Sequence, residues 1–91
     1  MINVITFRTE APLLWIEILS HDDSMAEVWQ RANELVALGV PYVWIIEPNT
    51  LESELRSAAG TVHLADKVLR LPDHGIVIPL IEVMHGLSAK P

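Results

Sequence analysis

Two apolar runs on either side of one capped helix constrain the fold of this 91-residue chain most. The runs cover residues 13–19 and 42–47, and their length and β-branched or aromatic content are typical of strands buried on both faces. Between them, Ser24 and Glu27 form a capping-box pattern ahead of apolar residues at helical spacing, and Gly39 stands where a helix ends. This order predicts a βαβ-like unit with parallel strands.

The other segments predict short strands around that unit. We expect a strand in residues 1–10, a strand in 51–59, a hairpin of 61–65 with 67–71 that turns at Asp66, a strand in 75–78, and a terminal helical turn that begins at Pro79. The pattern predicts an α/β (α+β) domain, with a small mixed β-sheet and one main flanking helix.

Composition limits the classes of partner. Twelve acidic and six unclustered basic residues give a net charge of -6, which argues against tight nucleic-acid binding and leaves weak DNA binding open. The chain contains no cysteine, no signal-like N-terminus and no apolar run long enough for a membrane span, so we expect a cytoplasmic protein without membrane contact. Small size with 51% hydrophobic residues favours a homo-oligomer, in the simplest case a dimer.

Glu17 is the residue in the first run that most needs an explanation, because an ionised carboxylate in an apolar strand loses its water. One interpretation is a structural carboxylate, half exposed or paired with an arginine such as Arg31. The other is a ligand of a hard cation such as Mg²⁺, which prefers carboxylate oxygens.

Other polar residues add alternatives. A second acidic ligand would have to be Glu10, Asp22 or Asp23, although the two aspartates are better explained as loop and helix-start residues. Arg31 either pairs with glutamates on the helix surface or faces Glu17 or a phosphate. The consecutive residues 20–22 (Ser-His-Asp) cannot converge as a hydrolase triad, and the four histidines show no zinc-like spacing.

Two stretches of the chain are the most specific: residues 12–23, with the pattern PLLWIEILSxDD, and residues 39–48, GVPYVWIIEP. On these residues the chain resembles the Uma-two family of restriction endonuclease-like proteins. We expect a single domain at 1–91, with a weakly placed segment at 1–11, a family-like core at 12–84 and a tail at 85–91. The family is similar to the PD-(D/E)xK nucleases, so the resemblance implies a restriction-endonuclease-like core and Mg²⁺-dependent phosphodiester hydrolysis. It also implies catalytic roles for Glu17, as the metal ligand, and for Arg31, as the cation.

The sequence departs from that family in its N-terminal half. Leu19 replaces the superfamily lysine, Arg31 stands where the family usually has lysine, and the first metal-binding aspartate has no counterpart before Glu17. The chain therefore resembles an N-terminally truncated, C-terminal half of such a nuclease, with weak or no activity. The alternative is a non-catalytic dimerisation or interaction module. A carboxylate of Glu17 that opens beside another acid would favour the enzyme, and one held by Arg31 would favour the module.

Overall fold

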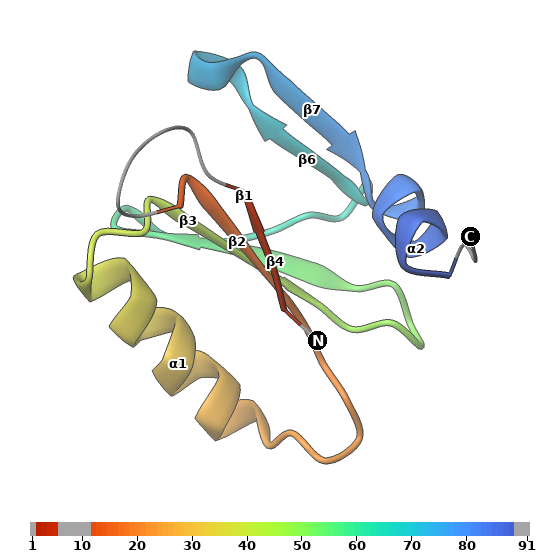
Figure 1. The fold of residues 1–91 in the computed structure, drawn as a ribbon, viewed down its shortest axis with the longest axis horizontal. Coiled ribbons are helices and arrows are strands. Elements are labelled where there is room, and N and C mark those ends of the chain that lie inside the picture. The colour runs from red at the N-terminus through yellow and green to blue at the C-terminus, as the bar shows by residue number, and fades with distance from the viewer. Residues whose placement is uncertain (1, 6–11, 89–91) are drawn as a thin grey trace.

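The chain forms two sheets and two helices, and the computed structural model describes residues 2–5 and 12–88 (Figure 1). The large sheet has the strand order β1-β2-β3-β4-β5, and a two-stranded sheet joins β6 to β7. The elements are β1 (Ile2–Ile5), β2 (Leu14–Ile18), α1 (Met25–Ala37), β3 (Tyr42–Ile46), β4 (Ser53–Ser57), β5 (Gly60–His63), β6 (Val68–Leu71), the 3-10 turn η1 (Pro72–His74), β7 (Ile76–Pro79) and α2 (Leu80–Ser88). The expected mixed α+β architecture is confirmed.

The β2-α1-β3 unit has the predicted parallel pairing. Leu14 lies opposite Tyr42 and Ile18 lies opposite Ile46, so both strands end at the same edge of the sheet. β1 pairs antiparallel with the other side of β2, and β4 pairs antiparallel with β3. β2 and β3 are therefore the central strands, which agrees with their almost continuous apolar sequence.

Local side-chain and backbone contacts fix both ends of α1. The Ser24 hydroxyl accepts a hydrogen bond from the Glu27 amide at 3.1 Å and donates one to Glu27 Oε1 at 2.8 Å. In a full capping box, the Glu27 carboxylate would instead accept a hydrogen bond from the Ser24 amide. At the other end, the amide of Val40 donates to the carbonyl of Leu35 at 3.0 Å, and Gly39 has a φ of 102°. This is a Schellman ending, which places its glycine in a backbone region that side chains disfavour.

The predicted hairpin of residues 61–65 with 67–71 is wrong. β5 turns back onto β4, with Ser57 opposite Gly60, and β6 pairs with β7. Gly60, at a φ of 128°, permits the tight β4–β5 turn. The turn at Asp66, whose Oδ1 accepts the amide of Val68 at 3.2 Å, instead carries the chain from one sheet to the other.

The C-terminal helix is longer than the predicted turn. Pro79 is the last residue of β7, and α2 begins at Leu80. It continues to Ser88, so it enters the segment 85–91 that the sequence assigned to a tail. Neither helix in the described ranges has the length and apolar character needed to cross a membrane.

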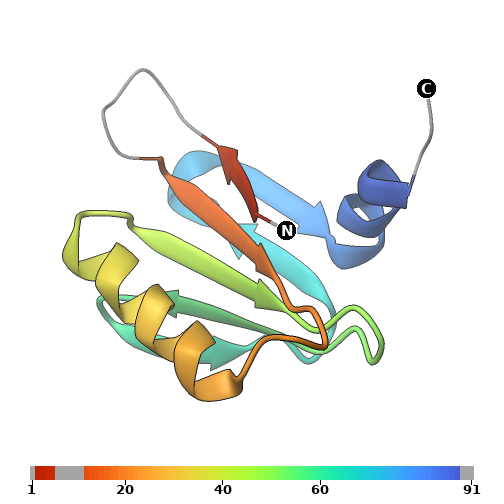
Figure 2. The same ribbon diagram turned by 60° about the horizontal axis from the view of Figure 1, so that its bottom comes forward.

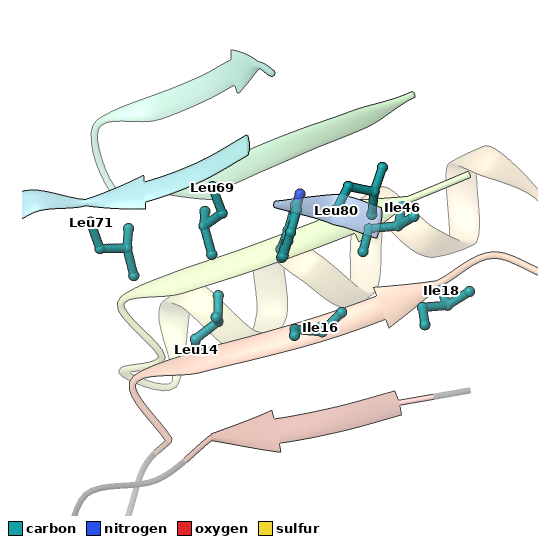
Figure 3. Packing of buried hydrophobic residues seen from close by; sticks show 8 residues of the cluster. Leu14, Ile16, Ile18, Ile46, Leu69, Leu71 and Leu80 are labelled. Atoms are coloured by element: carbon teal, nitrogen blue, oxygen red, sulfur yellow. The ribbon is translucent and has the colours of Figure 1, made fainter. Parts of the chain in front are cut away.

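Two hydrophobic clusters hold the layers together, with α1 on one face of the large sheet and the β6–β7 hairpin with α2 on the other (Figure 2). Beneath α1 the buried residues are Val28, Ala32, Val40, Val43 and Ile45. The opposite cluster contains Leu14, Ile16, Ile18, Trp44, Ile46, Leu69, Leu71 and Leu80 (Figure 3). Each fully buried leucine contributes about 1.5–3 kcal/mol, so the hairpin is an integral part of the core.

Candidate functional site

Glu17 lies on β2, on the face that α1 covers. Strand alternation places its side chain with those of Trp15 and Leu19, which pack against the cluster beneath the helix. Its parallel partner in the register is Ile45. With 2% of its surface exposed, Glu17 is as buried as the apolar residues around it. The carboxylate therefore depends on protein groups to replace its hydration.

Arg31 of α1 supplies most of that replacement. Its Nε donates to Glu17 Oε1 at 3.1 Å and its Nη2 donates to Glu17 Oε2 at 2.9 Å, in a bidentate pair. Trp15 Nε1 donates to Oε1 at 3.1 Å. Both carboxylate oxygens are thus engaged, and the structural interpretation of Glu17 as paired with Arg31 matches this geometry.

The hydrogen bonds at this site favour the ionised forms of Arg31 and Asp23. The hydrogen bond to Glu17 holds the pKa of Arg31 above its usual value. The Arg31 side chain keeps 38% of its surface exposed, and its Nη2 also lies 3.8 Å from Asp23 Oδ1. The Ser20 amide, which donates to Asp23 Oδ2 at 2.9 Å, is the main cause of a lowered pKa at Asp23. A permanently charged guanidinium therefore lies between two carboxylates.

This arrangement does not fit a Mg²⁺ ion at Glu17. A hard cation needs several free oxygen ligands, and both Glu17 oxygens are already held by N–H donors. Within residues 12–85, no group of three or more histidine, aspartate or glutamate side chains is placed to hold a metal ion. The nearest acid to the pair, Asp23, contacts the guanidinium.

The remaining candidates from the sequence are dispersed. Asp23 binds the Ser20 amide and hydroxyl, which is the loop role that the sequence favoured, and Asp22 is exposed beside His21, 3.6 Å away. Glu10 lies outside the described residues. The four histidines, at positions 21, 63, 74 and 85, are all exposed. Of the two interpretations of Arg31, the structure has the contact with Glu17 and not an ion pair with the glutamates of its own helix.

The tryptophans have two kinds of environment. Trp44 is fully buried in the core, whereas Trp15 of β2 and Trp29 of α1 are partly buried against the cluster beneath the helix. A polar role for Trp15 was not predicted. Its position two residues before Glu17, on the same face of one strand, is the signal that predicts their contact.

A cavity of about 210 Å³ lies at the ends of β2 and β3. Its lining combines apolar and acidic side chains: Leu19, Met25, Ile45, Glu47, Thr50, Glu52, Ser53 and Glu54. Glu47 is held in a turn, where it accepts the amide of Thr50, and this bond lowers its pKa. Glu47 therefore stabilises the turn that follows β3.

A group of paired charges, which the sequence does not predict, lies beside this cavity. His63 Nδ1 lies 3.2 Å from Glu54 Oε2, and Lys67 Nζ lies 3.4 Å from Glu52 Oε2. The pairing of β4 with β5, which the sequence did not predict, brings Glu54 opposite His63. Basic side chains therefore already partner two acids of the cavity lining.

A solved structure from Anabaena variabilis ATCC 29413, described as a "putative nuclease belonging to DUF820", matches this chain with a TM-score of 0.67. The sequences are 22% identical over 85% of this chain and 46% of that chain. The fold is nuclease-like. This chain thus corresponds to a little less than half of its neighbour's length. No protein-family model matches the chain, and the search of curated proteins found no match.

Proposed function

We propose that this chain is a nuclease-like domain that does not hydrolyse phosphodiester bonds efficiently by itself, and that it functions by associating with another polypeptide, in the first instance a second copy. Its fold is similar to that of a protein described as a putative nuclease, which supports the structural part of the proposal. The functional part of the proposal rests on the hydrogen bonds to Glu17. Arg31 and Trp15 donate to both oxygens of this carboxylate, which metal-dependent cleavage would need as a metal ligand.

Surface composition supports association. Large apolar side chains on three separate elements are more than half exposed, namely Val62 on β5, Val77 on β7 and Ile81 on α2. In the described part of the large sheet, β5 is an edge strand. Exposed apolar surface and an edge strand both favour contact with another chain.

A second candidate is a metal-dependent endonuclease of the PD-(D/E)xK type, as the Uma-two resemblance implies, in which Glu17 binds Mg²⁺ and Arg31 faces the phosphate. The 38% exposure of Arg31 favours this candidate, since that surface is open to an anion from solvent. The described residues place Glu17 and Asp23 at the guanidinium and supply no third acid there. A complete site would need further ligands from another segment or subunit.

Plasmid cleavage distinguishes the two candidates. The purified chain is incubated with supercoiled DNA and millimolar Mg²⁺ or Mn²⁺, beside Glu17→Gln and a control, Glu34→Gln, at an exposed acid of α1. We expect the same background cleavage for all three proteins. Metal-dependent cleavage that Glu17→Gln abolishes and Glu34→Gln retains would contradict the proposal and establish the endonuclease.

Light scattering coupled to gel filtration tests the association. We expect a dimer that Val77→Asp or Ile81→Asp weakens, because a buried charge would replace an apolar contact. A wild-type protein that stays monomeric at every accessible concentration would exclude self-association.

A further inference from the structure

The position beside Glu17 where a metal ion would bind is filled by a side chain of the protein itself. One nitrogen of Arg31, Nη2, lies 2.9 Å from Glu17 Oε2 and 3.8 Å from Asp23 Oδ1. Two carboxylates, completed by water or other oxygen ligands, also hold many hard divalent cations. The guanidinium balances the charges that would otherwise attract such an ion.

Arg31 stays charged and bound to Glu17 over the ordinary pH range. Arginine is charged at every ordinary pH, and its planar group matches the two oxygens of Glu17. A divalent cation would have to displace two hydrogen bonds and approach a like charge at close range. At an effective dielectric constant of about 20, a like charge about 4 Å away costs about 4 kcal/mol per unit charge.

We propose that Arg31 is a resident cation that excludes divalent metals from Glu17, and that neutralising residue 31 opens a latent divalent-cation site between Glu17 and Asp23. This inference rests on the proposed function and deepens it, because it gives the physical reason why the domain lacks a metal-dependent site of its own.

The surroundings of the two carboxylates suit such a latent site. Asp23 is oriented through Oδ2, which accepts the Ser20 amide at 2.9 Å and the Ser20 hydroxyl at 3.3 Å, while Oδ1 faces Arg31. Glu17 is oriented by Trp15 on Oε1. Because Arg31 is partly exposed, its removal would let water reach the vacated space and complete the coordination of an ion.

The test compares Mn²⁺ binding by the wild-type chain, Arg31→Gln, Arg31→Ala and the double variant Glu17→Gln/Arg31→Gln. Electron paramagnetic resonance measures free Mn²⁺, and thermal unfolding with and without Mn²⁺ gives a second readout independent of any cleavage. We expect both single variants to bind about one Mn²⁺ per chain, on the order of a hundredfold or more tighter than the wild type, and to unfold at higher temperature when Mn²⁺ is present. The double variant should show neither effect.

Three results would overturn the inference: wild-type binding of Mn²⁺ that depends on Glu17, folded Arg31 variants that neither bind nor are stabilised by Mn²⁺, and Arg31 variants that stay unfolded with Mn²⁺ present. The last would mean that the ion does not replace the guanidinium. Wild-type Mn²⁺ binding at Glu17 without DNA cleavage would overturn this inference alone. Glu17-dependent cleavage would overturn the proposed function as well.

Discussion

The Glu17–Arg31 pair predicts unequal costs for removing its two members. In Arg31→Ala the carboxylate of Glu17, which is 2% exposed in the wild type, loses its counter-charge and two hydrogen bonds and keeps the hydrogen bond from Trp15. Leaving a buried charge without its partner costs about 3–5 kcal/mol. In Glu17→Gln the shape is kept and the guanidinium, 38% exposed, can turn toward water and Asp23. Loss of a charged hydrogen bond there costs about 1.5–3 kcal/mol.

A domain of this size has a total stability of roughly 5–15 kcal/mol, so the larger cost would remove a substantial part of it. Urea unfolding at neutral pH, followed by tryptophan fluorescence, measures both variants. The matched control is Arg56→Ala, whose side chain donates to the neutral oxygens of Asn33 and Thr61, and we expect a change below about 1 kcal/mol. Equal costs for Glu17→Gln and Arg31→Ala, or a larger cost for Glu17→Gln, would refute the argument that the burial of the carboxylate dominates.

Four further predictions test the fold. Leu69→Ala should destabilise the domain by about 2–5 kcal/mol in urea unfolding, because this fully buried leucine joins the hairpin to the large sheet. Gly39→Ala should lower the melting temperature, because φ at this position is 102°, a value that alanine disfavours. Gly60 also has a positive φ, so Gly60→Ala cannot serve as the control. Ser24→Ala should cost about 1 kcal/mol by chemical denaturation, through loss of the bond to the Glu27 amide. In the folded chain, the Thr50 amide lowers the pKa of Glu47 from its ordinary value of 4.5. The ionised carboxylate therefore stabilises the fold above pH 4.5, and this stabilisation is lost as the pH falls below that value. Glu47→Gln should reduce the acid sensitivity of unfolding.

The β2-α1-β3 unit could be predicted from the sequence because its determinants are local. The apolar runs, the hydroxyl of Ser24 and the glycine at position 39 each act on their own segment, and the structure has the expected elements there. The partners of β5 and β6 could not be predicted in the same way. A turn at Asp66 was visible in the sequence, but which strands pair depends on contacts between distant segments, such as that of Leu69 with the large sheet.

The sequence predicts which residues form the candidate site, but not whether Glu17 binds a metal ion or pairs with Arg31. Burial of Glu17 followed from its apolar neighbours, and Arg31 was one of the partners considered. A metal ion and a guanidinium both supply positive charge, so the sequence pattern alone fits either. The choice depends on the position of α1 over β2, which brings Arg31 to within 2.9 Å of the carboxylate and adds the contact with Asp23.

The residues of the charged site come from β2 (Trp15 and Glu17), from the loop that follows it (Asp23) and from α1 (Arg31). The site is therefore encoded in one short, continuous stretch of the gene. A recombination event that exchanged the strands on either side would pass it on whole, whereas a site assembled from distant segments would be broken up. Descendants of such events would share this charge cluster even where the rest of their chains had diverged.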